Sequence, residues 1–293
     1  MGKFSALLLA SDFDDTLLPT SHLAAQGTAA REISRENREA LSYFIAQGGH
    51  FTVSTGRSAA TFAPYVQSIP MNAPAIVSGG GALYDYHSQR YQYFTYLCPE
   101  SCSDLATLSA RFPEAALELY HKGEEVCILH PNAFSEAHCR VTGTLLRQVS
   151  SVDAAGAPFH KALFEGDASC LQNLADFMKN KGMTARYELI FASPHMLELT
   201  ARGADKGTML LRLAAMLGIS RRGVCAVGDH CNDLPMLRAA SFAFAPKNAV
   251  QEVRALAGIC IVRSAHEHAL QDVVARLEQR FSPAMPDAPA VSK

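Results

Sequence analysis

Short, continuous apolar runs alternate with helical stretches at both ends of this 293-residue chain. Near the start, runs without polar alternation cover Ser5–Ser11, Phe51–Ser54 and Ala75–Ser78. Runs of this kind are typical of strands that are covered on both faces. Between the first two, Ser34 is placed to cap a helix that carries Leu41 and Phe44 on one face, and Gly48 follows its end.

The same rhythm returns in the last part of the chain. The expected elements are a helix at Lys206–Leu217, strands at Val224–Val227, Phe242–Ala245 and Ile259–Val262, a helical stretch at Ala249–Ala257 and a final helix from Leu270 to Phe281. Strands that alternate with helices of this length predict an α/β fold, with a parallel sheet covered by helices on both faces.

The middle of the chain has a different character, because it is richer in tyrosine, histidine and polar residues. Its strands, at Glu118–Tyr120 and Val126–Leu129, are expected to be half-exposed, and amphipathic helical stretches are expected at Glu136–Val149 and Ala168–Lys181. We therefore predict an α+β insertion at residues 84–194, within a discontinuous core domain. That core covers residues 1–83 and 195–281, and the proline-containing tail at 282–293 is expected to be disordered.

Composition excludes several classes of partner. The formal net charge is −2 and no basic cluster is present, so neither a nucleic acid nor an anionic membrane surface is expected as a partner. No apolar stretch is long enough to span a membrane, and the short run before Asp12 is better explained as a buried strand than as a signal peptide. The eight cysteines are scattered singly, which predicts a reduced, cytoplasmic protein without a metal–thiolate site.

Two groups of acidic residues follow predicted strands directly. Asp12 and Asp14 lie after the first strand, one residue apart, so that one carboxylate can act as nucleophile and the other as general acid and base. Asp229 and Asp233 lie after a later strand. Ligands of open parallel sheets bind beyond the carboxyl ends of the strands, so the two groups are expected to converge. The alternatives are a turn cap at Asp14 or Asp15, and a helix N-cap at Asp233.

Converging carboxylates need a cation, because like charges in a small volume disfavour joint ionisation. An all-oxygen ligand set beside a phosphate-sized space predicts Mg²⁺. Two further elements suit an anion. Thr55-Gly56-Arg57 follows the second strand, and Lys206 opens a helix at the end where a cation opposes the helix dipole.

Together these pieces resemble, in order, the four motifs of the haloacid dehalogenase (HAD) superfamily, and the surrounding sequence resembles its Cof-type (class IIB) phosphatases. The motifs are Asp12-Phe13-Asp14-Asp15-Thr16, Thr55-Gly56-Arg57, Lys206-Gly207 and Gly228-Asp229-x-x-Asn232-Asp233. The similarity extends over nearly the whole chain, up to Phe281. It implies a Rossmann-like parallel sheet core with an inserted α+β cap domain of the C2 type.

The resemblance also implies roles for individual residues. Asp12 is expected to attack phosphorus and form an aspartyl-phosphate, and Asp14 to protonate the leaving group and then activate water. The implied Mg²⁺ ligands are Asp12, Asp14, Asp229 and Asp233. The implied phosphate-binding residues are Phe13, Thr55, Gly56, Lys206 and Asn232.

The expected activity is therefore Mg²⁺-dependent hydrolysis of a small phosphomonoester, a sugar phosphate or similar metabolite. A phosphomutase or phosphotransferase would use the same aspartyl-phosphate, and stays an alternative. A non-catalytic phosphate-ligand sensor would be expected to lack Asp12 or Asp14, and both are present. The sequence predicts neither the individual substrate nor the oligomeric state.

Several residues outside this set are assigned lesser roles. His160, Lys161 and Arg186, in the expected cap, are interpreted as solvated surface positions, and Arg57 as a brace for its loop. His230 and Cys231 occupy variable positions of the fourth motif and are not expected to bind Mg²⁺. Two further segments depart from the family pattern. Gly80 stands where relatives usually carry Asn, and His266 and His268 are interpreted as surface or helix-start residues.

Overall fold

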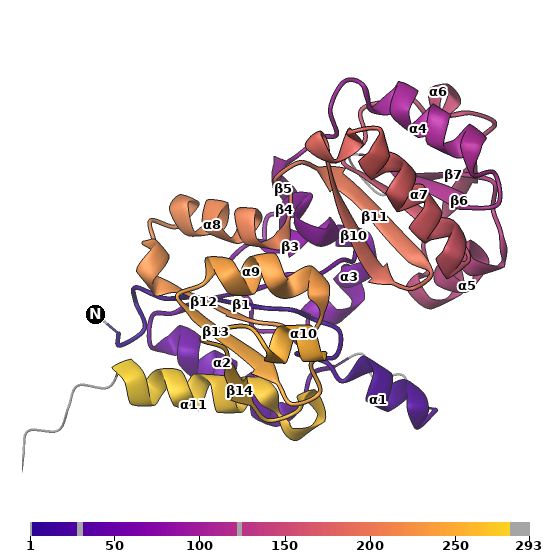
Figure 1. Cartoon of the computed structure of the whole chain (residues 1–293). Coiled ribbons are helices and arrows are strands. Elements are labelled where there is room, and N and C mark those ends of the chain that lie inside the picture. Colours follow the sequence, from indigo (N-terminus) through magenta and orange to yellow (C-terminus); the bar gives the residue numbers. More distant parts are fainter. Residues whose placement is uncertain (1, 28–31, 122–124, 282–293) are drawn as a thin grey trace, which may run out of the picture.

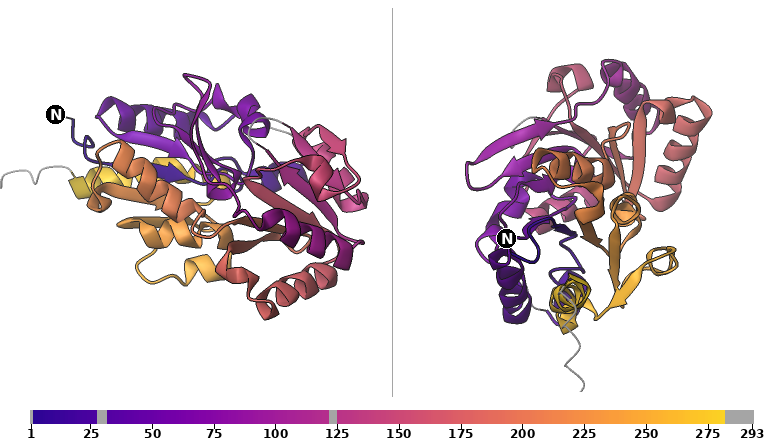
Figure 2. Two further views of the ribbon diagram at one scale, coloured as in Figure 1. Left: turned by 90° about the horizontal axis from the view of Figure 1, so that it is seen from above. Right: turned by 90° about the vertical axis from the view of Figure 1, so that its left-hand side faces the viewer.

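The computed structural model describes residues 2–27, 32–121 and 125–281 of the chain. The tail expected to be disordered, 282–293, lies outside these residues. The described strands form three sheets, and the two larger ones lie beside each other, each with its own helices (Figures 1 and 2). Among the described helices, none has both the length and the hydropathy needed to cross a lipid bilayer.

The first sheet is parallel and five-stranded, in the order β14-β13-β12-β1-β2. Its strands are β1 (Leu8–Ser11), β2 (His50–Val53), β12 (Val224–Val227), β13 (Phe242–Pro246) and β14 (Cys260–Val262). The predicted alternation of strands and helices is thus confirmed as an α/β fold. The residue pairs Ser11–Val53 and Ser11–Val227 show that β1, β2 and β12 end at the same level.

Helices cover both faces of this sheet (Figure 1). On one side lie α2 (Arg35–Ala46) and α11 (Ala269–Phe281), and on the other α8 (Lys206–Met216) and α9 (Leu234–Ala239). Along β1, Leu9 packs in the cluster with α2 and α11, whereas Leu8 and Ala10 pack in the cluster with α8 and α9. Burial of both faces explains why the sequence of β1 is apolar without alternation. The Ser34 hydroxyl caps α2 as predicted, accepting a hydrogen bond from the Asn37 amide.

The strand expected at Ala75–Ser78 belongs to a separate antiparallel sheet. That sheet contains β3 (Ala75–Val77), β4 (Ala82–Asp85) and β5 (Arg90–Phe94). It meets the end of β2 through hydrogen bonds that include one of 2.8 Å, from the Thr55 amide to the Ile76 carbonyl. Gly80 lies in the turn after β3 at φ 103°, and a Cβ there would lie 2.3 Å from the Asp205 carbonyl carbon. The turn therefore packs so closely on the start of α8 that Asn would not fit at position 80.

The third sheet is mixed and six-stranded, in the order β10-β11-β9-β6-β7-β8. Its strands are β6 (Ala116–Tyr120), β7 (Val126–Leu129), β8 (Leu146–Gln148), β9 (Lys161–Glu165), β10 (Tyr187–Ser193) and β11 (Met196–Ala201). Its helices are α4 (Ser101–Arg111), α5 (Ala133–Thr142), α6 (Val152–Ala155) and α7 (Ala168–Asn180). The short helices elsewhere are α1 (Thr20–Ala25), α3 (Ala59–Val66) and α10 (Gln251–Arg254).

Two expectations for this region were wrong. β6 and β7 are buried along their whole length rather than half-exposed, because helices cover one face and the other turns toward the five-stranded sheet. The helix expected at Glu136–Val149 ends at Thr142, where Gly143 takes a left-handed conformation (φ 71°) and leads into β8. β11 pairs with β9 and β10. The assignment of residues 195–281 to the core stays a prediction.

We expect Gly223→Ala to lower the free energy of unfolding by about 1–3 kcal/mol or more, because its Cβ would lie 1.9 Å from the Ala6 carbonyl oxygen. Gly166→Ala is the matched control, since its Cβ would make only ordinary contacts, the nearest at 3.6 Å. Urea unfolding followed by far-ultraviolet circular dichroism measures both, because the chain has no tryptophan. Equal stability of the two variants would contradict the expectation.

Candidate active site

Three strands of the five-stranded sheet deliver polar residues to one edge. Asp12 follows β1, Thr55 follows β2 and Asp229 follows β12. The backbone continues the sheet for one more step here, since the Asp12 amide donates to the Val227 carbonyl at 2.9 Å. The structure thus brings together the two acidic groups that are far apart in sequence, as strand order predicts.

A buried lysine joins both groups. The Lys206 ammonium lies 2.6 Å from Oδ1 of Asp12 and 2.6 Å from Oδ1 of Asp233. Its side chain is only 1% exposed. It opens α8, where the Asp205 carboxylate caps the helix by accepting from the Gly207 and Thr208 amides. A cation at this end of a helix is disfavoured by the helix dipole, and the two carboxylates that Lys206 binds compensate for that cost.

The loop after β12 wraps around the carboxylate of Asp233. Oδ2 of Asp233 accepts from the amides of Asp229 (2.9 Å) and His230 (3.1 Å). A Cβ at Gly228 would lie 2.5 Å from the Asp233 carboxyl carbon, so only glycine fits there. Asp233 does occupy the N-cap position of α9, but its side chain makes no capping bond to that helix. The N-cap alternative was therefore wrong for this side chain, which binds the preceding loop instead.

The buried carboxylates carry more negative charge than Lys206 can neutralise. Burial, and then the charge of Asp233, raise the pKa of Asp12 well above its usual value, although Lys206 acts in the opposite sense. Burial and Asp233 also raise the pKa of Asp229 to about 7, against a hydrogen bond from Thr16. Burial alone would lower the pKa of Lys206, but Asp12 and Asp233 raise it above its usual value.

The same residues fit a hard divalent cation. One carboxylate oxygen each from Asp12, Asp229 and Asp233 lies within 4.8 Å of the others, and all three residues are buried. The Thr16 hydroxyl orients Asp229 at 2.8 Å. An all-oxygen set with excess negative charge is what Mg²⁺ binds in proteins.

Asp14 is held apart from that cluster by Arg57. The guanidinium donates to both carboxylate oxygens, at 2.9 Å from Nε and 2.8 Å from Nη2, and the Thr20 hydroxyl donates at 2.8 Å. Arg57 itself packs against the rings of Phe13 and Tyr65, 5.4 and 4.9 Å from their centroids. Arg57 therefore does more than brace its own loop, because it sets the position of the Asp14 carboxylate. Asp15 is left-handed (φ 57°), a conformation that glycine adopts without strain.

The predicted phosphate-binding residues lie around the same edge. Gly56 and Asn232 line the cavity described below, and Thr55 is buried with its hydroxyl accepting from the Arg57 amide at 3.1 Å. The side chain of Phe13 is in the hydrophobic core, packed on Phe62. Phe13 can therefore reach a phosphate only through its backbone amide.

A cavity of about 340 Å³ lies between this edge and the six-stranded sheet. Its walls include Asp12, Asp14, Gly56, Arg57, Asp229 and Asn232 on one side, and Tyr120, His138, Lys161, Met196 and Glu198 on the other. Lys161 bridges the two sides, since its ammonium lies 2.7 Å from Oε1 of Glu198 and 3.4 Å from the Gly56 carbonyl.

This placement corrects the expectation that His160 and Lys161 are solvated. Both are buried, and burial lowers the pKa of His160 to about 4, which favours a neutral ring packed near Phe94. Arg186 is half-exposed and pairs with Asp104 at 2.8 Å, away from the cavity lining. His230 lines the cavity, and Cys231 is exposed. All eight cysteines are free thiols.

Sequence reasoning missed several residues of the cavity wall, Tyr120, His138 and Glu198 among them. Glu198 carried a signal, because it is a charged residue in the middle of an apolar strand. Tyr120 and His138 carried none, because strand pairing and the packing of α5 bring them to the cavity.

Without metal, the protein is expected to lose stability as pH rises. The folded pKa of Asp229, about 7, lies above the usual value of an aspartate, so its contribution to stability is present at low pH and is lost as pH rises to 7. Each pH unit that separates the folded from the unfolded pKa corresponds to about 1.4 kcal/mol. Urea unfolding in EDTA at acidic and at neutral pH measures the loss. Asp229→Asn should flatten the dependence and Mg²⁺ should reverse it; an unchanged slope in both cases would contradict this cause.

Comparison with known proteins agrees with this geometry. The sequence profile of the haloacid dehalogenase-like hydrolases matches residues 9–274. The phosphatase YwpJ of Bacillus subtilis (strain 168) is 27% identical over 272 residues, covering 85% of this chain and 92% of its own length. The pyridoxal phosphate phosphatase YbhA of Escherichia coli (strain K12) is 25% identical, covering 87% of this chain and 92% of its own.

Solved structures show the same fold. A haloacid dehalogenase-like hydrolase from Bacteroides thetaiotaomicron superposes with a TM-score of 0.77 at 24% identity, covering 92% of this chain and 99% of its own. A HAD subclass IIB sugar phosphatase superposes with a TM-score of 0.76 at 18% identity, covering 92% and 98%. With strand order, buried acidic cluster and profile in agreement, the chain belongs to the haloacid dehalogenase-like hydrolase family.

Proposed function

We propose that this enzyme is a Mg²⁺-dependent phosphohydrolase that cleaves small phosphomonoesters through an aspartyl-phosphate on Asp12. The observation that carries the proposal is the buried cluster of Asp12, Asp229 and Asp233 around Lys206, open to a cavity at the carboxyl edge of the parallel sheet. Matched relatives with phosphatase names, YwpJ and YbhA among them, support the same class of reaction.

Phosphoryl transfer needs positioning and charge neutralisation more than covalent assistance. Bound Mg²⁺ would supply neutralisation, held by Asp12, Asp229 and Asp233, with Asp14 contributing its backbone carbonyl. Lys206 holds Asp12 in place by its 2.6 Å contact and adds a positive charge beside the attacked phosphoryl group. Thr55, Gly56, Asn232 and the Phe13 amide would hold the other phosphoryl oxygens.

Asp14 is proposed as the general acid that protonates the leaving alcohol and then as the base that takes a proton from water. It suits that role because its side chain is 38% exposed and lines the cavity, unlike the buried Asp12. Arg57 and Thr20 hold its carboxylate in one orientation. Orientation of this kind is what efficient proton transfer requires.

The substrate is proposed to be a small phosphorylated metabolite, such as a sugar phosphate. The cavity volume, about 340 Å³, suits a small molecule, and the polar wall that contains Lys161 and Glu198 suits a leaving group with several hydroxyls. Residues 84–194, together with β11, are proposed to act as the cap over the core formed by 1–83 and the rest of 195–281. Cytoplasmic location stays a prediction.

Hydrolysis of p-nitrophenyl phosphate by the full-length protein tests the proposal. We expect turnover with Mg²⁺, none in excess EDTA, and a loss of at least about a thousandfold in Asp12→Asn, which lacks the nucleophile. Asp176→Asn is the control, because its side chain is exposed on α7, pairs with Lys179 and does not line the cavity. A panel of phosphate esters that all resist the wild-type protein would overturn the proposal.

A second prediction concerns Arg57. Arg57→Lys should lower kcat by roughly 10–100-fold with a smaller change in KM, because an ammonium cannot make the paired contacts that orient Asp14. Steady-state kinetics on p-nitrophenyl phosphate measures it. Arg35→Lys, a substitution on the exposed face of α2, should have no effect. A kcat equal to that of the wild type would exclude an orienting role for Arg57.

A further inference from the structure

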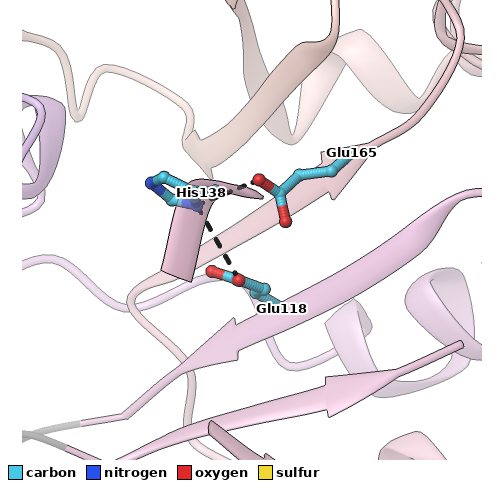
Figure 3. Close-up of side chains that lie close together, drawn as sticks. All are labelled: Glu118, His138 and Glu165. Carbon is cyan, nitrogen blue, oxygen red and sulfur yellow. Dashed lines mark ion pairs between the residues drawn. The ribbon is translucent and has the colours of Figure 1, made fainter. Parts of the chain in front are cut away.

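A second group of metal-ligating side chains lies in the six-stranded sheet and α5. Figure 3 shows Glu118, His138 and Glu165 turned toward one another. Glu118 comes from β6, Glu165 from the neighbouring strand β9, and His138 from α5. Nδ1 of His138 lies 2.9 Å from Oε1 of Glu165 and 3.8 Å from Oε1 of Glu118. One ligand atom from each residue lies within 4.8 Å of the others.

These groups are buried without enough partners. The Glu165 side chain is 1% exposed, and its Oε2 has no hydrogen-bond partner among the residues that the structure describes, whereas Oε1 faces only His138. Oε1 of Glu118 is also without a hydrogen-bond partner there, since its contact with His138 is 3.8 Å long. A single N–H on Nδ1 can point at only one oxygen, and 3.8 Å is too long for a hydrogen bond to the other. A protonated histidine alone therefore leaves buried carboxylate oxygens unsatisfied, which is costly.

A metal ion at the point where the three side chains meet would satisfy all of them at once. Two carboxylates and one imidazole can bind a cation from three directions. The N–H of His138, by contrast, can donate in one direction only. The hydroxyl of Tyr120 donates to Oε2 of Glu118 at 2.6 Å and so leaves Oε1 free to face the cluster. A hydrogen bond of this kind, behind a ligand, is what orients carboxylates in metal sites.

The donor set differs from the one around Lys206. Asp12, Asp229 and Asp233 offer only oxygen, whereas His138 adds an imidazole nitrogen. Imidazole with carboxylates favours Zn²⁺ and similar first-row transition metals over Mg²⁺. His138 is 19% exposed and lines the same cavity as Asp12 and Asp14, so one side of the cluster faces the space that a substrate would occupy.

We propose that Glu118, His138 and Glu165 form a second cation site, which takes a transition-metal dication such as Zn²⁺ in the cavity wall opposite the catalytic carboxylates. Three protein ligands leave one coordination position open toward the cavity, for water or for an oxygen of the leaving group. This site goes beyond the proposed function, which requires only the Mg²⁺ site on the parallel sheet.

The test uses the full-length protein in which Asp12→Asn and Asp229→Asn remove the first site. After treatment with chelator, we expect calorimetric titration with Zn²⁺ to show one equivalent bound in this background. Titration with Co²⁺ should give d–d absorption without a thiolate charge-transfer band, which excludes cysteine ligands. Glu165→Gln, a substitution that keeps size and shape, should weaken binding at least about a hundredfold, because loss of a partner that only orients a ligand already costs about 10–100-fold.

The matched control is Glu136→Gln, which removes an exposed carboxylate from the same helix as His138 and should leave Zn²⁺ affinity unchanged. His138→Gln is a second variant, partly exposed and so less dependent on correct packing. Circular dichroism verifies that each variant is folded. Absence of Zn²⁺ binding in the background protein, or binding that persists in both Glu165→Gln and His138→Gln, would show that the cluster is only a buried ion pair. The test measures metal binding and not activity. A negative result would therefore contradict the second cation site without bearing on the Mg²⁺-dependent hydrolysis proposed for the wild-type protein.

Discussion

The contact of one buried ammonium with two buried carboxylates holds the centre of this molecule together. Lys206 belongs to α8, Asp12 follows β1, and Asp233 lies in the loop between β12 and α9. Removing the lysine would leave two carboxylates facing each other away from water, which is why breaking a buried pair typically costs about 3–5 kcal/mol. The same contact holds the Asp12 carboxylate at the sheet edge, so that one interaction serves both the fold and the chemistry.

Around that centre, close packing of the backbone gives the site its shape. Gly228 lets the loop after β12 fold onto the Asp233 carboxylate, and Gly80 lets the turn after β3 approach the first residues of α8. Neither position has room for a Cβ. Rigid loops of this kind hold charged groups that repel one another, and the excess negative charge that remains is what makes a divalent cation favourable.

Charged residues in the cavity wall opposite the parallel sheet are paired with one another rather than solvated. Lys161 on β9 binds Glu198 on β11, and Glu165 at the other end of β9 meets Glu118 on β6 and His138 on α5. A strand that is apolar on its helix-covered face and charged on its cavity face looks half-exposed in sequence. In the folded protein both faces of the six-stranded sheet are shielded from bulk water here. β6 and β9 are therefore fully buried in spite of their charged residues.

Sequence reasoning succeeded where a local pattern has one physical reading. Continuous apolar runs predict strands covered on both faces, and the polar residues that follow such strands lie at the carboxyl edge of a parallel sheet. Accordingly, β12 and the helix that begins at Lys206 start where expected. It failed where a side chain has several possible partners. Asp233 could cap α9 or bind the loop before it, and His160 and Lys161 could face water or the interior. Only the position of neighbouring strands decides between these.

By itself, then, the sequence determined the α/β class and the strand ends that carry Asp12, Asp14, Asp229 and Asp233, because burial periodicity is a local property of the chain; the roles of these four residues stay predictions. The tertiary structure alone decided that Arg57 grips Asp14, that Lys161 and Glu198 form a buried pair beside Gly56, and that Glu118, His138 and Glu165 meet. Those contacts depend on strand order and helix packing, which join residues that are 20 to more than 40 positions apart and leave no periodic mark in the sequence.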